Sequence, residues 1–177
     1  MQSNPGVPGV IGKLRTCSTW PGVKIFNFRL FKKCTKAEAI YYLDTRKKQG
    51  FNVIQAMLLH ELTVTDVKGD SALIDSDVSK PNDSKGYWAM VDFVIAEAAK
   101  RKMYMALVPV WGGNVKGGHV SENQARAYAK FLAARYKKYD NIIWLNGGDI
   151  KGSDGEKIWN IIGETLHQND GRHLITF

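Results

Sequence analysis

Helix signals and strand signals alternate along this chain from about residue 35 to its end. Helices are predicted over about 35–49 and 86–101 and after the polar tetrapeptides that begin at Ser121 and Ser153, and strands are predicted over 51–58, 103–110, 141–146 and 172–177. Strands that alternate with helices in this way are typically parallel and joined by right-handed crossovers. The chain is therefore expected to fold as an α/β protein with a parallel sheet.

Capping residues and apolar stripes support these helices. Three pairs have the spacing of capping boxes: Thr35 with Glu38, Ser121 with Gln124, and Ser153 with Glu156. Apolar residues recur every three or four positions in two of the helices, and these are Trp88, Val91, Ile95 and Ala98, and Ala125, Tyr128, Leu132 and Tyr136. Each stripe is predicted to face the core.

The residues at the strand ends distinguish a doubly wound open sheet from a (β/α)8 barrel. No strand is followed by the glycine pattern of a nucleotide site. Acidic, amide and aromatic residues follow the strands instead, and they are His60, Glu61, Trp111, Asn146 and Asp149. Barrel enzymes build small-molecule sites from such side chains at the C-terminal ends of their strands, so we favour a barrel.

The length of the chain suffices for only part of a barrel. A (β/α)8 barrel needs about 200 to 250 residues, whereas the 177 residues here contain four strands from residue 51 onward and room for a fifth within 20–34. The expected fold is a partial (β/α)8 TIM barrel, roughly its N-terminal half, from the first helix to the fifth strand. Open parallel edges favour self-association, which we expect to occur through the sheet edges.

The positive charge is concentrated near the N-terminus. Residues 1–48 hold ten basic and two acidic side chains, which accounts for the whole net charge of +8. We therefore divide the chain into a basic leader, 1–34, which fits a frame-shifted or incomplete first strand, and a barrel domain, 35–177. Because a nucleic-acid surface needs a basic stripe across the folded part, no nucleic acid partner is expected.

Several further classes of protein are not indicated. No apolar run approaches the roughly 18 to 20 residues of a membrane span, and the N-terminus lacks the apolar core of a signal peptide. Cys17 and Cys34 do not have the spacing of a zinc site. We therefore expect no membrane partner, no export signal, no metal site and no cofactor.

The connection over 59–85 is much longer than the two to six residues usual between a strand and a helix, so it is predicted to form the wall of a site. Asp75 and Asp77 resemble the start of a calcium loop but lack the glycine and glutamate at the required offsets. The acidic residues of this connection are therefore expected to be solvated.

Five ordered motifs resemble one family of enzymes. They are KAEAIYYLDTRKKQGFNVIQAMLLHE, ALIDSDVSKPND, VPVWGG, ARAYAKFLAARYKKYDNIIWLNGGD and GRHLITF. Over about 35–177 the chain resembles the catalytic barrel of the apiosidase-like glycoside hydrolases, family 140. The resemblance implies hydrolysis of pectin side chains of the plant cell wall, apiose-containing ones among them, and an oligosaccharide or polysaccharide substrate. It also suggests a secreted or periplasmic location, although the sequence itself leaves the location open.

The resemblance assigns roles to the strand-end residues. Asp149 corresponds to the family's general acid/base, and a carboxyl group set among Trp144, Gly147 and Gly148 is expected to be shielded from water and to hold a proton for the leaving group. Glu61 corresponds to an acidic residue that lines the sugar site. Trp111 resembles a stacking platform for a sugar ring. Asn146 and His60 are candidates for binding sugar hydroxyls, with structural hydrogen bonds as the alternative for each.

The chain also departs from the family. Residues 1–34 lack the Gly-Asp-Thr and the nearby tryptophan of the family's first strand, and WGGNVKGGH lacks an aspartate after Trp-Gly. The nucleophile's strand is expected beyond Phe177, so this chain alone is expected to be inactive. Two other interpretations remain, a non-catalytic carbohydrate-binding half-barrel and a (β/α)8 enzyme of another reaction class with Glu61, Asp149 and His60 as metal ligands.

Overall fold

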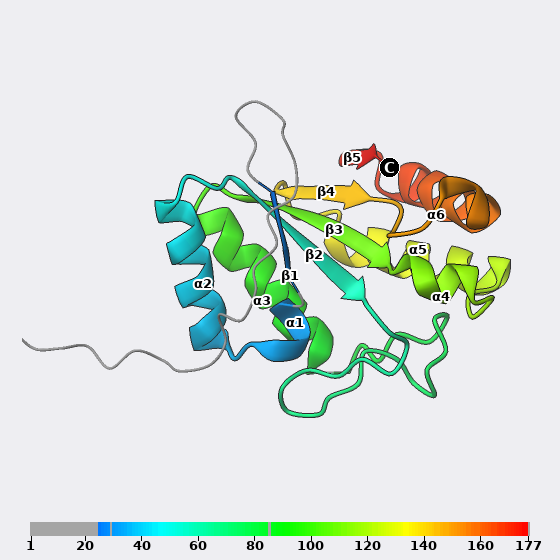
Figure 1. Ribbon diagram of the computed structural model, residues 1–177, viewed down its shortest axis with the longest axis horizontal. Coiled ribbons are helices and arrows are strands. Elements are labelled where there is room, and N and C mark those ends of the chain that lie inside the picture. Colours follow the sequence, from blue (N-terminus) through cyan, green and yellow to red (C-terminus); the bar gives the residue numbers. More distant parts are fainter. Residues whose placement is uncertain (1–24, 29, 85, 177) are drawn as a thin grey trace, which may run out of the picture.

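The computed structural model describes residues 25–28, 30–84 and 86–176, whose strands form one five-stranded parallel sheet in chain order (Figure 1). The strands are β1 (Ile25–Phe28), β2 (Val53–Leu59), β3 (Tyr104–Val110), β4 (Ile142–Leu145) and β5 (Leu174–Thr176). In the register of the sheet, Val53 lies opposite Tyr104, and Met105 lies opposite Ile142. The predicted parallel sheet is confirmed, and so is the additional strand expected within 20–34.

Helices connect the strands. They are α1 (Leu30–Lys33), α2 (Lys36–Lys48), α3 (Tyr87–Lys100), α4 (Gly112–Lys116), α5 (Glu122–Tyr136) and α6 (Glu156–Asn169), with a 3-10 turn, η1 (Gly152–Asp154), before α6. Every crossover steps to the next strand in the same direction, so right-handed connections put the helices on one side of the sheet. Within the described ranges, no helix has the length and apolar character of a membrane span.

The two predicted apolar stripes form much of the core. The eight residues predicted on α3 and α5 are all completely buried. Trp88 of α3 donates a hydrogen bond from Nε1 to the carbonyl of Ala72 over 2.8 Å, and its ring packs edge-on against Phe131 with ring centroids 4.9 Å apart. A single tryptophan thereby joins the long connection after β2 to both α3 and α5.

Two of the three predicted capping boxes are present. Thr35 and Glu38 cap α2, and Ser121 and Gln124 cap α5. The box predicted at Ser153 is wrong, because Gly152–Asp154 forms η1 and α6 begins after Gly155 without a side-chain cap. A Cβ at Gly155 would lie 2.7 Å from both Trp159 Nε1 and Val115 Cγ1, so the chain passes too close to these side chains for another residue to fit unchanged.

The folded unit begins before Thr35, within the segment that the sequence predicts to be a leader. β1 pairs with β2, and Leu30, Phe31 and Cys34 are buried in the core. Burial raises the pKa of the Cys34 thiol to about 11, so this free cysteine is inert near neutral pH. Cys17 lies outside the described residues.

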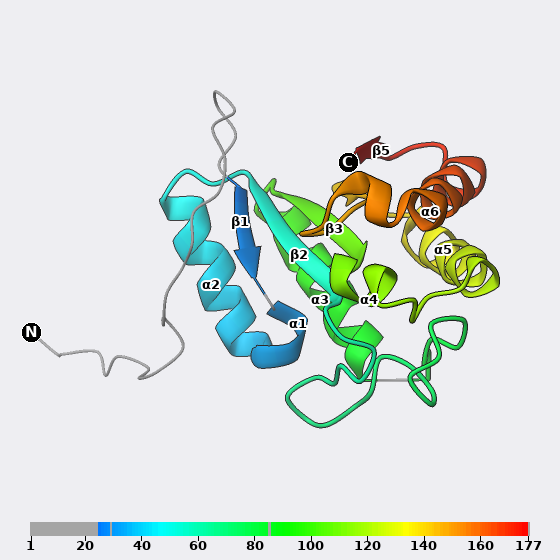
Figure 2. The ribbon, with the colours of Figure 1, turned by 45° about the vertical axis from the view of Figure 1, so that its right-hand side comes forward.

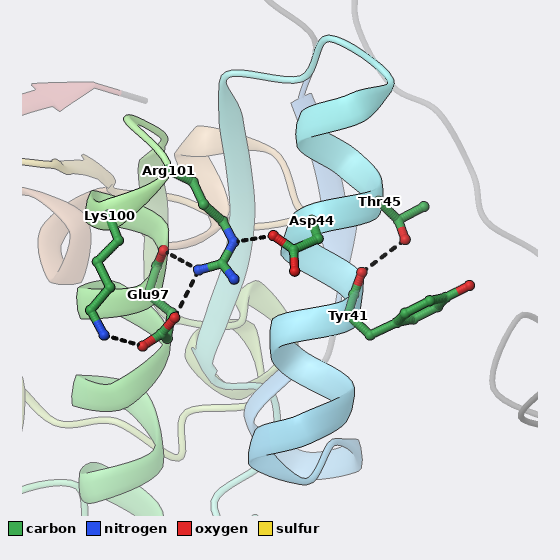
Figure 3. Close-up of polar contacts among 6 residues, drawn as sticks. All are labelled: Tyr41, Asp44, Thr45, Glu97, Lys100 and Arg101. Atoms are coloured by element: carbon green, nitrogen blue, oxygen red, sulfur yellow. Dashed lines mark hydrogen bonds and ion pairs between the residues drawn. The ribbon is translucent and has the colours of Figure 1, made fainter.

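A polar cluster joins α2 to α3 on the outside of the sheet (Figure 3). Arg101 donates hydrogen bonds from Nε to Asp44 over 2.7 Å and from Nη1 to Glu97 over 2.8 Å. The bond from Arg101 lowers the pKa of Asp44, and bonds from Lys100 and Arg101 lower the pKa of Glu97. Both pKa values lie below those of the unfolded chain, so this stabilisation is present above the ordinary carboxyl range and is lost as the pH falls through the folded values.

Candidate active site

The C-terminal ends of β2, β3 and β4 lie side by side, because these strands are parallel and adjacent. Glu61 follows β2, Trp111 follows β3 and Asp149 follows β4. The backbone N–H of Trp111 donates to the carbonyl of Leu59 over 2.8 Å, which continues the pairing of β2 and β3 into this region. Figure 2 shows α4 and the long connection beyond the arrowheads of these two strands. These chain segments therefore converge on the edge of the sheet formed by the C-terminal ends of the strands.

Trp111 is held in place by its neighbours. The ring of His60 stacks on it, with centroids 6.0 Å apart and planes 11° from parallel. Asn114 of α4 donates from Nδ2 to the carbonyl of His60 over 3.1 Å and to that of Trp111 over 3.3 Å. The imidazole thus lies against one side of the indole, and the tryptophan remains partly exposed. Asn114 was not predicted from the sequence, although it stands three residues after Trp111.

Two glycines bring the end of β4 against the end of β3. A Cβ at Gly148 would lie 2.3 Å from the backbone nitrogen of Gly112, and a Cβ at Gly112 would lie 2.9 Å from Ile150. The backbones can approach this closely only because neither residue has a side chain. Gly148 and Gly112 therefore determine how near Asp149 lies to the Trp111 loop.

Asp149 is exposed, and its carboxylate has no hydrogen-bond or ion-pair partner among the described residues. The expected shielding by Trp144 is wrong. Trp144 is completely buried and donates from Nε1 to Asp170 over 3.0 Å, on the helix-covered side of the sheet. Strand alternation explains the difference, because Trp144 lies within β4 and points toward the layer of helices, whereas Asp149 lies in the loop beyond the strand.

Asn146 lies in the core rather than on the surface. It is completely buried, and its Nδ2 donates to the carbonyl of Trp159 over 2.6 Å. A Cβ at Gly163 would lie 2.8 Å from this Nδ2, so α6 approaches the amide closely at a glycine. Of the two alternatives expected for Asn146, the geometry favours the structural hydrogen bond.

Glu61 forms an ion pair with Lys32 of α1, which couples the end of β2 to the segment after β1. Both side chains are partly exposed, at 41% for Glu61 and 32% for Lys32. The sequence did not predict Lys32, because it lies among the other basic residues of the presumed leader. The pair places one positive and one negative charge at the edge where the strand-end residues meet.

The acidic residues of the long connection have structural partners. Asp66 accepts hydrogen bonds from the backbone N–H groups of Lys68 and Asp70 over 2.8 and 3.0 Å. Asp77 accepts from the hydroxyl of Ser79 over 2.7 Å and from Nε2 of Gln124 over 2.9 Å, and these bonds hold its pKa far below the usual range. The expectation that these acids are merely solvated is therefore wrong for Asp66 and Asp77, because they organise the loop and attach it to α5.

A metal site is not built by this part of the chain. Across residues 25–28, 30–84 and 86–176, no three side chains of histidine, cysteine, aspartate or glutamate lie close enough together to hold a metal ion. His60, Glu61 and Asp149, the ligands of the metal-dependent interpretation, do not form such a cluster. The groups at this edge are carboxylates, an ammonium group, the His60 imidazole and an aromatic surface.

Comparison with known proteins identifies relatives of the chain. The model of the family described as apiosidase-like, catalytic domain, matches residues 27–177. A search of curated proteins finds no match. The family match begins within β1, in agreement with a folded unit that starts before Thr35.

Solved structures support the same relationship. A protein described as a glycoside hydrolase is 34% identical with a TM-score of 0.80, over 86% of this chain and 36% of its own. A glycoside hydrolase family 5 protein from Bacteroides vulgatus is 32% identical with a TM-score of 0.79, over 86% of this chain and 34% of its own. The endo-1,4-beta-mannanase from Rhizomucor miehei, 13% identical with a TM-score of 0.58, shares the fold. This chain thus spans about a third of the length of the first two structures, and its sheet corresponds to part of a TIM barrel.

Proposed function

Because this chain belongs to the apiosidase-like family of glycoside hydrolases, we propose that it is the N-terminal half of a catalytic barrel that cleaves plant cell-wall polysaccharide. The proposed substrate is pectin, including its apiose-containing side chains. One observation carries the proposal: Glu61, Trp111 and Asp149 follow three adjacent parallel strands of a glycoside hydrolase-like domain. This is the edge at which barrel enzymes bind their substrates.

Asp149 is proposed to be the general acid/base. It lies on the loop after β4, is exposed, and is not neutralised by a basic side chain among the described residues. An exposed carboxyl group can reach a bound substrate and exchange protons with water. In a complete barrel, this position at the C-terminal end of a strand would place the carboxyl group within reach of the leaving oxygen of a bound sugar, as a general acid requires.

Trp111 and Glu61 are proposed to contact the sugar. An aromatic face packs against the C–H groups of a sugar ring, and the stacked His60 ring and Asn114 hold the indole in a defined orientation. The Glu61 carboxylate can accept hydrogen bonds from sugar hydroxyls, and the ion pair with Lys32 keeps it oriented. Asn146 is proposed to have a structural role only, since it is completely buried and donates a hydrogen bond to the carbonyl of Trp159.

The second carboxylate of a glycosidase is proposed to lie outside this chain. Hydrolysis of a glycosidic bond requires two carboxyl groups about 5 to 9 Å apart across the bond. The ion pair with Lys32 favours the role of a substrate contact for Glu61 rather than that of the second carboxylate. The chain by itself is therefore proposed to be inactive.

Completion of the barrel tests the proposal. We expect a chimera in which this chain is joined to the remaining part of the 34%-identical glycoside hydrolase to release sugar from pectic oligosaccharides, whereas the 177-residue chain alone should release none. Sugar release is measured by chromatography of the products. Binding without cleavage by the chimera would instead support the non-catalytic carbohydrate-binding interpretation, and turnover by the chain alone would mean that Glu61 or another carboxylate here completes the pair.

Self-association is proposed for the isolated chain. β5 is the outermost strand of the described sheet, and Leu174 on it is 64% exposed. Unpaired strand edges and exposed apolar residues favour association. We expect sedimentation velocity to show dimers or larger species whose fraction rises with concentration. A compact monomer at all concentrations would contradict this proposal without affecting the assignment of Asp149.

A further inference from the structure

A group of lysines gathers at the end of the sheet opposite to the candidate active site. α2, α3 and α5 all end beside the starts of the strands that follow them, as Figure 1 shows for α2 and α3. Lys47 and Lys48 lie at the end of α2, Lys102 follows α3, and Lys137 and Lys138 follow α5. All five are exposed, and we call them the lysine face.

The acidic side chains at this end do not neutralise the lysine face. Asp44 and Glu97 bind Arg101, and Asp140 pairs with Arg172. Asp170 is buried against His173. Within the described part of the chain, none of the five lysines forms an ion pair, although the charge of Lys48 contributes to the lowered pKa of Asp44. The face therefore carries an excess of positive charge.

Helix termini explain why a lysine is favoured at each of these positions, but not why the lysines share one face. Cations near a helix C-terminus are favoured by the helix dipole: Lys47 and Lys48 lie in the last turn of α2, Lys102 lies two residues after α3, and Lys137 and Lys138 directly follow α5. The three groups come together because the strands are parallel, so that these helices all end at the same end of the sheet. α2 packs on α3, and α3 contacts α5 through Trp88 and Phe131, so the three groups of lysines lie on neighbouring elements along the starts of the strands.

We propose that the lysine face binds an acidic polysaccharide, a chain that carries uronate carboxylates. The class of polymer rests on the proposed function, because the substrate of that function is pectin and its backbone is acidic. Ammonium groups on flexible stems can follow the carboxylates of a polymer without fixed geometry. A polymer held here would stay close to the protein between encounters of its side chains with the opposite, strand-end face.

Affinity electrophoresis of the 177-residue chain tests the proposal without any need for turnover. Retardation is measured in native gels that contain de-esterified pectin, with highly methyl-esterified pectin as the uncharged comparison. We expect retardation in the de-esterified polymer only. It should weaken as the salt concentration rises from about 0.05 to 0.5 M, because the Debye length shrinks below the spacing of the charges.

Variants with matched charge locate the surface. The triple variant Lys47→Gln, Lys102→Gln, Lys137→Gln removes one cation from each group and is expected to weaken binding about tenfold. The control Lys68→Gln, Lys130→Gln, Lys151→Gln removes three exposed lysines elsewhere and is expected to change binding less than about twofold. Both variants keep residues 1–24, so the basic residues of that segment contribute equally. Because all six positions are exposed, circular dichroism should show unchanged folding.

Equal losses in the two triple variants would overturn the proposal, because binding would then follow net charge alone. Equal retardation in highly methyl-esterified and de-esterified pectin would overturn it as well, since binding would then not need the carboxylates. Equally strong binding of single-stranded DNA would contradict the assignment to acidic polysaccharide. If the completed barrel binds pectin at the lysine face but releases no sugar, the proposed function is wrong while the lysine-face proposal stands.

Discussion

Replacement of Asp149 by asparagine in the completed barrel is expected to lower cleavage of an unactivated oligosaccharide by about two to four orders of magnitude, the usual contribution of general acid/base catalysis. The amide keeps the size of the side chain and its contacts with a sugar but cannot supply a proton. The loss should appear in kcat more than in KM, because protonation of the leaving oxygen matters in the transition state.

Two comparisons distinguish this effect from a change in structure. An aryl glycoside, whose leaving group needs little protonation, should lose much less activity with Asp149→Asn. Asp140→Asn removes the same charge from the opposite end of the sheet, where Asp140 is 82% exposed and paired with Arg172, and should leave cleavage within about twofold. Full activity of Asp149→Asn on an oligosaccharide would exclude Asp149 as the acid.

Replacement of Trp88 by alanine is expected to destabilise the completed barrel by about 3 to 5 kcal/mol, the range for removal of a large buried aromatic side chain. Trp88 is completely buried and packs against Tyr87 and Phe131, with ring centroids 5.5 and 4.9 Å away. Its removal would leave a cavity between α3, α5 and the long connection. The free energy is measured from the midpoint and slope of urea unfolding.

Conservative variants separate packing from hydrogen bonding at this position. Trp88→Phe keeps an aromatic ring but removes the N–H that donates to the Ala72 carbonyl, which still accepts from the backbone N–H of Asn82 over 2.9 Å. The lost hydrogen bond should cost about 0.5 to 1.5 kcal/mol, in addition to the cost of the smaller ring. Tyr41→Ala, at a position 63% exposed, should change stability by less than about 0.5 kcal/mol. A similar urea midpoint for Trp88→Ala and Tyr41→Ala would mean that the α3–α5 layer is not the core of the fold.

The sequence by itself determined the α/β architecture, because its periodic patterns are local. The stripes through Trp88 and Tyr128 and the boxes at Thr35 and Ser121 each depend on residues a few positions apart, which a helix brings together on its own. The order of the parallel strands followed, since short right-handed crossovers leave few arrangements. The motif NIIWLNGGD was specific enough to indicate the family that the comparisons identify.

Local patterns did not suffice where a residue's role depends on what packs against it. The third capping box is wrong because the chain passes close to Trp159 and Val115 at Gly155. The predicted start of the fold is too late because the burial of Leu30 and Phe31 depends on the sheet against which they pack. Asn146 and Asp149 stand three residues apart after the same strand, yet α6 covers the first and leaves the second in water.

Only the tertiary structure decided which charges meet. Lys32 and Glu61 are 29 positions apart in the sequence and form an ion pair because β1 and β2 are adjacent. The lysine face joins Lys47 and Lys48, from the basic first part of the sequence, with Lys102, Lys137 and Lys138 from residues 49–177, whose total charge is balanced. Coulomb interactions depend on separation in space, and the parallel sheet determines that separation by bringing the starts of successive strands together.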